Sequence, residues 1–145
     1  MGMERELNRI LTKNIEGYQG LEKASEYIED KSIKNFIEAL ASKKKEQADE
    51  ISEYMISIKL KPTESGTTLG QLHRAIMDVV GQIKSKQQAA IVKECIRGEK
   101  MAREEYEKAL KSNTLKKEAL TMAMKHRDRS IAAIQTFQKL SSVLV

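Results

Sequence analysis

The chain has 145 residues, a length typical of a single domain, and it carries a formal net charge of +5. Hydrophobic residues make up 40% and charged residues 32%, which excludes an intrinsically disordered chain and a membrane-embedded one. A single cysteine excludes an intramolecular disulfide framework and a cysteine-rich zinc module. We therefore expect one domain over residues 1–145.

We identify neither a membrane-spanning segment nor a secretory signal in this sequence. No apolar run approaches the ~18 residues that a spanning helix needs. Residues 1–14 carry scattered charges and lack the apolar core of a secretory signal. One free thiol also suits a reducing compartment. We expect a cytoplasmic protein without a membrane partner.

The composition favours long helices, because seven glycines, one proline and no tryptophan leave few turn-forming residues. Apolar residues recur at spacings of three and four along most of the chain, which predicts an all-α fold. In chain order we predict helices over residues 7–28, 32–59, 69–83, 90–110 and 115–144. Ser32 is the predicted N-cap of the second helix, and residues 112–114 are predicted to end the fourth and cap the last.

The segment between the second and third long helices, residues 60–87, decides the topology. Its loop residues are followed by a short helix that ends near the polar residues 85–87, and this helix alone spans ~22 Å. The segment can therefore cross the length of the bundle. The prediction is a ferritin-like up-down-down-up four-helix bundle with a short extra helix in the crossover, and a five-helix up-and-down array is the alternative.

Three stretches carry a family resemblance. They are Glu94-Cys95-Ile96-Arg97-Gly98-Glu99-Lys100-Met101-Ala102, Leu72-His73-Arg74-Ala75 and Glu16-Gly17-Tyr18. In this order and separation they resemble a bacterial four-helix-bundle family of the ferritin and rubrerythrin type, which is classified as a domain of unknown function. The resemblance covers about residues 7–135. The resemblance implies a ferritin-like fold, but it implies no particular enzymatic reaction.

Bundles that hold two iron or manganese ions take a Glu from each of two helices and a Glu-x-x-His pair from each of the other two. This sequence contains no Glu-x-x-His pair. At the inward spacing the second helix offers Lys44 and Gln47, and the last helix offers Ala123 and His126. We therefore predict no catalytic, cofactor or metal site, and keep an iron or manganese protein as the alternative.

Polar residues nevertheless gather at the middle of the predicted bundle. When the helices are aligned from their turns, the candidates for a mid-bundle polar layer are Tyr18, Lys44, Gln47, Glu99, Glu105 and His126. In this layer Glu99 or Glu105 is expected to pair with His126 or Lys44, and to specify register rather than catalysis. Gly17 and Gly98 lie at the same level, where they either allow close helix approach or leave room for a water molecule.

Two further residues, His73 and Cys95, have side chains that can take part in catalysis or metal binding in other proteins. His73 lies on the apolar stripe of the crossover helix, where we expect a satisfied core histidine. Cys95 lies on a core stripe, where a thiol is usually inert.

Three functions fit these observations. We favour a non-catalytic bundle protein that works by self-association or by binding an unidentified protein. The second hypothesis is a metal or redox protein with a degenerate or intersubunit site. The third hypothesis is a weak binder of nucleic acid or of an acidic partner. Acidic residues interleaved with the basic ones, and an aromatic content of only 4%, argue against this third hypothesis.

The last predicted helix points to the mode of self-association. Near its end Ile131, Ile134 and Phe137 occupy more than one narrow stripe, so a single helix contact cannot cover them all. We therefore expect an apolar overhang and a two-fold symmetric homodimer through this helix.

Overall fold

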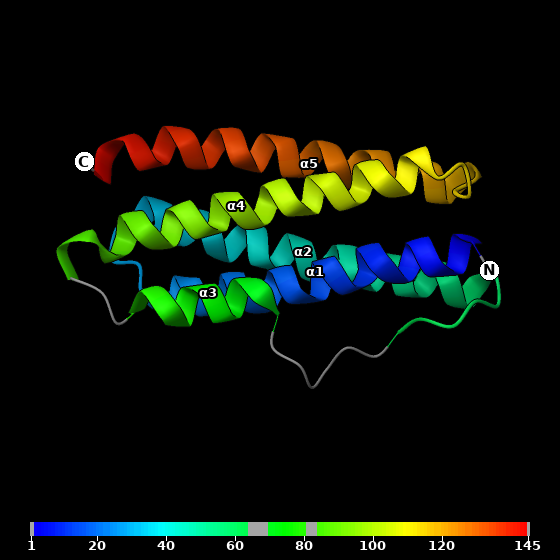
Figure 1. Ribbon diagram of the computed structural model, residues 1–145, viewed down its shortest axis with the longest axis horizontal. Helices are drawn as coiled ribbons and strands as arrows, with labels where there is room; N and C mark the ends of the chain where they lie inside the picture. The colour runs from blue at the N-terminus through cyan, green and yellow to red at the C-terminus, as the bar shows by residue number, and fades with distance from the viewer. Residues whose placement is uncertain (1, 64–69, 81–83, 145) are drawn as a thin grey trace.

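In the computed structural model the chain is a bundle of α-helices (Figure 1). The structure describes residues 2–63, 70–80 and 84–144. The helices are α1 (Gly2–Ser25), α2 (Lys31–Ser57), α3 (Gln71–Val80), α4 (Lys84–Lys111) and α5 (Lys117–Ser141), followed by a 3₁₀ turn at Ser142–Leu144. The described residues form no strand, which confirms the all-α prediction. None of the helices described here combines the length and apolar character needed to cross a membrane.

The four long helices lie side by side, and contacts at the helix starts show their directions. The backbone N–H groups of Glu29 and Asp30, just before α2, donate to Oε1 of Gln88 near the start of α4, at 2.7 and 2.9 Å. α2 and α4 therefore begin at the same end of the bundle. They run in one direction, and α1 and α5 run in the other (Figure 1).

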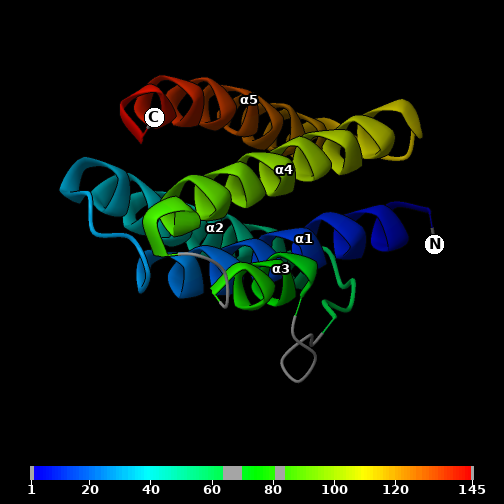
Figure 2. The same ribbon diagram turned by 60° about the vertical axis from the view of Figure 1, so that its left-hand side comes forward.

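α3 lies in the connection between α2 and α4 and packs on the outside of α1 and α4 (Figure 2). Its Leu72 side chain reaches the backbone of α1, because a Cβ added at Gly20 would lie 2.5 Å from Leu72 Cγ. Only glycine permits this approach. The close contact between Gly20 and Leu72 thus holds the crossover helix against the bundle.

The predicted limits of the crossover need correction. The polar residues 85–87 do not separate two helices, because they lie within α4. Their side chains are all compatible with a helix, and no glycine or proline stands among them. Leu69 and Ile83, the predicted ends of the short helix, lie outside the described residues.

The turn between α1 and α2 also differs from the prediction. α1 ends at Ser25 rather than at residue 28. Asp30 caps α2, because its backbone is extended and its Oδ1 accepts a hydrogen bond from the backbone N–H of Ile33 at 3.0 Å. The assignment of Ser32 as N-cap is wrong, since Ser32 already lies in the first helical turn.

Residues 112–114 end α4 as predicted but do not cap α5. Asn113 adopts a left-handed conformation with φ of 59°, which asparagine tolerates better than most residues. The hydroxyl groups of Ser112 and Thr114 lie 2.8 Å apart and bond to each other. α5 begins at Lys117 without a side-chain cap.

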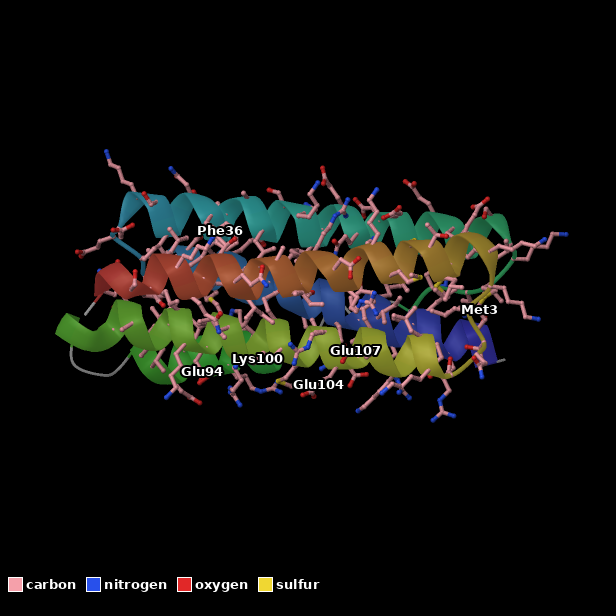
Figure 3. The ribbon with its side chains drawn as sticks, turned by 90° about the horizontal axis from the view of Figure 1, so that it is seen from above. Met3, Phe36, Glu94, Lys100, Glu104 and Glu107 are labelled. Atoms are coloured by element: carbon pink, nitrogen blue, oxygen red, sulfur yellow. The ribbon has the colours of Figure 1, made fainter. Side chains whose placement is uncertain are left out.

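The end of α5 is covered more fully than expected. Ile134 is 6% exposed, and Phe137 is fully buried in an edge-to-face contact with Phe36 of α2, with ring centroids 4.8 Å apart. Figure 3 shows Phe36 between α2 and α5. The expectation that Ile134 and Phe137 form an exposed overhang is wrong, because neighbouring helices bury both. Ile131 is half-buried.

The cap of α2 gives a direct test of these local assignments. Asp30→Ala should lower the free energy of unfolding by about 1 kcal/mol, because the N–H of Ile33 loses its partner. Ser32→Ala is the matched control and should change it by less than about 0.5 kcal/mol. Urea denaturation of both variants measures the difference. An equal loss in the two variants would contradict the Asp30 cap.

Candidate functional site

The apolar core is divided into two clusters. One lies toward the end where α2 and α4 begin and includes Leu21 and Phe137. The other lies toward the opposite end and includes Leu7 and Ile51. The mid-bundle polar layer consists of the buried residues Asn14, Lys44, Gln47, Glu99, His126 and Ser130 together with the hydroxyl group of Tyr106. The layer lies between the two clusters and is contributed by all four long helices.

Lys44 of α2 and Glu99 of α4 form an ion pair inside the bundle. Lys44 Nζ lies 2.9 Å from Glu99 Oε1, and the two side chains are 4% and 3% exposed. The ammonium also donates to the hydroxyl oxygen of Ser130 on α5 at 3.4 Å. Burying either charge alone would cost several kcal/mol, so each charge depends on the other.

A second set of contacts joins α1, α2 and α5 through two amides. Gln47 Nε2 donates to Asn14 Oδ1 at 2.7 Å, and Arg129 donates to Gln47 Oε1 at 3.2 Å. Asn14 Nδ2 in turn donates to the carbonyl oxygen of Ile10 at 2.8 Å. Both buried amides are therefore bonded through their oxygen and their nitrogen, as buried polar groups require.

A chain of hydrogen bonds leads from Asn14 to the surface between α2 and α5. Asn14 Nδ2 donates to the Tyr106 hydroxyl oxygen at 2.6 Å, this hydroxyl lies 3.0 Å from His126 Nδ1, and His126 Nε2 lies 2.7 Å from Glu50 Oε1. The Glu50 carboxylate can only accept a hydrogen bond from Nε2, so Nδ1 of the neutral ring is unprotonated and accepts the hydroxyl hydrogen of Tyr106. The network thus assigns the proton to Nε2 of a neutral His126, which donates to Glu50. The Glu50 side chain is 49% exposed.

The surroundings of His126 favour this neutral form. Burial lowers the pKa of His126 below its ordinary value of 6.5. The hydrogen bond and charge of Glu50 act in the opposite direction, whereas the positive charges of Arg129 and Lys44 lower the pKa further. Burial also raises the pKa of the Tyr106 hydroxyl, so this group keeps its proton at neutral pH.

The structure brings together four of the six predicted layer residues, namely Lys44, Gln47, Glu99 and His126. Tyr18 is half-buried outside the layer, with the Lys45 ammonium 5.9 Å from the centre of its ring. Glu105 lies at the edge of the bundle, where Arg9 is 3.9 Å away. Glu99 pairs with Lys44, whereas the partner of His126 is Glu50 rather than Glu99 or Glu105.

Sequence reasoning missed several members of the network. Tyr106 lies in a spacing of apolar residues on α4, and a buried tyrosine hydroxyl, which needs a hydrogen-bond partner, is itself a signal of buried polarity. Asn14 carries the same signal on an otherwise apolar stripe. Glu50 and Arg129 lie beside the inward stripes, and their long side chains reach the layer from there.

The other two singled-out residues lie outside the network. His73 is half-buried in α3 rather than in the core, and its Nδ1 has no hydrogen-bond partner among the described residues. Cys95 is buried, and burial together with the charges of Glu99 and Glu94 raises the pKa of its thiol. The thiol therefore stays protonated and is a poor nucleophile.

Comparison with known proteins places the chain in a family. The model of a family described as "Domain of unknown function (DUF2383)" matches residues 3–112, from the start of α1 to the end of α4. The chain belongs to the DUF2383 family. No curated protein and no solved structure matches it. The matched region contains the α1, α2 and α4 residues of the layer, whereas His126 and Ser130 follow it.

The layer of this DUF2383 protein does not fit a carboxylate-bridged metal pair. Where such bundles place Glu-x-x-His, α2 has Lys44 and Gln47, and α5 has Ala123 and His126. Within the described residues, no three His, Cys, Asp or Glu side chains lie close enough to hold a metal ion. Lys44 instead supplies a positive charge beside Glu99.

The buried neutral histidine predicts that stability depends on pH. Because the folded pKa of His126 lies below 6.5, the unfolded state binds more protons just below that pH. The free energy of unfolding should therefore decrease as the pH falls below 6.5, by up to about 1.4 kcal/mol per pH unit from this group. The full contribution of the neutral His126 to the free energy of unfolding is present above pH 6.5.

Urea denaturation of the wild type and of His126→Gln between about pH 5 and 8 measures this effect. The variant should lose part of the pH dependence, whatever its overall stability, because glutamine does not titrate. Carboxylates that do not contact residue 126 contribute equally to both proteins and cancel in the comparison, whereas Glu50 is part of the measured effect. Identical pH dependences would contradict a buried neutral His126.

Proposed function

We propose that the chain is a ferritin-like four-helix-bundle protein that works without catalysis, by associating with itself or with another protein. The shared direction of α2 and α4, with α3 in the connection between them, supports the ferritin-like arrangement, because a single long crossover is typical of it. We place the protein in the cytoplasm in this proposal, since its single thiol suits a reducing compartment.

The ion pair between Lys44 and Glu99 carries the proposal of a non-catalytic role. The Lys44 ammonium lies 2.9 Å from the Glu99 carboxylate and is almost completely buried, at the level where a metal would stand in the di-metal bundles. It neutralises Glu99 without any bound ion. A second cation, Arg129, binds Gln47 in the same region and would further repel a metal ion.

α5 supplies the surface for the proposed association. Leu120 and Met124 are 38% and 44% exposed, and Ile131 is half-buried. Spacings of four and seven residues place the three side chains on one face of the helix. This face replaces the overhang expected from Ile134 and Phe137. Two-fold dimers are the commonest closed assemblies, so we propose a homodimer through this face of α5.

The alternative function is a metal or redox protein whose site is completed by a second chain. His126 and Glu50 lie 2.7 Å apart, and the half-exposed Glu50 reaches the surface between α2 and α5. Imidazole and carboxylate are suitable ligands for iron or manganese. One chain offers too few of them, so the missing ligands would come from a partner.

Metal analysis separates the two functions. Protein purified without a chelating tag should contain less than about 0.1 iron or manganese ion per chain, because Lys44 already neutralises Glu99. Elemental analysis and the visible spectrum measure this content, and Glu50→Gln is the informative variant. Stoichiometric metal in the wild type that is lost in Glu50→Gln would establish the intersubunit site and overturn the non-catalytic proposal.

Association is tested by light scattering at micromolar concentration. The wild type should have the mass of a dimer, and Leu120→Glu with Met124→Glu should shift it to a monomer, because two charges would enter an apolar interface. Ile56→Glu is the matched control, since Ile56 is 65% exposed and lies on a different helix, α2. A monomeric wild type would rule out self-association and leave binding to another protein. A dimer that survives the double substitution would rule out this face of α5.

A further inference from the structure

Two helical glycines of this protein are not required by close packing. A Cβ added at Gly17 would lie 3.6 Å from Lys44 Cδ, and one at Gly98 would lie 3.4 Å from Leu72 Cδ2. These are ordinary contact distances, unlike the overlap at Gly20. Alanine would therefore fit at both positions. At each position alanine would also raise the folding equilibrium constant about fivefold, because alanine is more favourable than glycine in a helix interior by that factor.

Gly17 and Gly98 both border a small cavity between α1 and α4. Its volume is about 40 Å³, and its walls include the Lys44 and Glu99 side chains and Leu72 of α3. A single water molecule needs roughly 10–15 Å³ of such volume, so the cavity has room for one to about three. The missing Cβ atoms at Gly17 and Gly98 contribute this space.

The cavity walls carry hydrogen-bonding groups suited to water. Glu99 Oε1 accepts no well-aligned hydrogen bond from the described residues, although Lys44 Nζ lies 2.9 Å away. The Lys44 ammonium has three N–H donors, and the structure directs it toward Glu99 and Ser130. A water molecule in a protein interior needs two to four polar partners. Lys44 of α2 supplies a donor and Glu99 of α4 an acceptor beside the cavity, which meets this requirement.

We propose that the cavity is a binding site for one or two water molecules, held by Lys44 and Glu99 and kept open by Gly17 and Gly98. The ligand donates a hydrogen bond to Glu99 and accepts one from Lys44. Leu72 lines the site on the side of α3. Bound water completes the hydrogen bonding of a buried ion pair, so the two glycines exchange helix stability for hydration of that pair. The site does not depend on metal content or on dimer formation.

The first test counts the bound water directly. Oxygen-17 magnetic relaxation dispersion should detect at least one long-lived water in the wild type and fewer in the double variant Gly17→Ala, Gly98→Ala. Leu72→Ala opens the wall on the side of α3 and should shorten the residence time of the bound water. A crystal structure at high resolution should show ordered water within hydrogen-bond distance of Lys44 and Glu99. A dry cavity in the wild-type crystal would overturn the proposal.

The second test uses folding equilibria and remains informative if a double variant folds poorly. Each single alanine variant should give no gain in the folding equilibrium constant, or a loss, because the new methyl group displaces water from the ion pair. Ala89→Gly, at an exposed position of α4, calibrates the helix effect and should lower the constant about fivefold. A fivefold gain at both Gly17 and Gly98 would show that the cavity is only a packing defect.

Discussion

The buried charge of Lys44 constrains the rest of the bundle. An ammonium in the core is tolerated only where a carboxylate meets it, and Glu99 does so from a different helix. Leu, Ile and Ala in the two apolar clusters pack in many combinations, so hydrophobic burial alone would accept several alignments of α2 against α4. A shift by one helical turn moves Lys44 about 5 Å away from Glu99. The ion pair thus favours one register, and the amides of Asn14 and Gln47 reinforce it.

The crossover depends on a different constraint, which acts through the backbone. Past the end of α2 the chain is bonded to the first turns of α1, because Lys61 N–H donates to Glu4 and Thr63 N–H donates to Asn8. Farther on, Leu72 enters the groove that Gly20 leaves open. α1 therefore guides the connecting segment at both ends. This guidance allows α4 to begin beside the start of α2.

Apolar spacing was enough to predict the helices because burial of one face decides which segments form them. Lys44, Gln47, Glu99 and His126 were visible as breaks in otherwise apolar stripes. The caps were less predictable, since Asp30 and Ser32 are both good capping residues and the choice depends on where the preceding turn leaves the backbone. The exposure of α5 was not predictable from one helix, because Phe137 is buried by Phe36, a residue about 100 positions earlier.

The two parts of the polar layer influence each other through charge, although different hydrogen bonds hold them. Lys44 lowers the pKa of His126, and Arg129 does the same from the next turn of α5. Protonation of His126 would place a third positive charge in this region, balanced by Glu99 and by the half-exposed Glu50. It would also direct a second N–H toward the Tyr106 hydroxyl, which already accepts from Asn14. The order of donors and acceptors along this chain therefore suits a neutral histidine, and acid would weaken the same layer that sets the register.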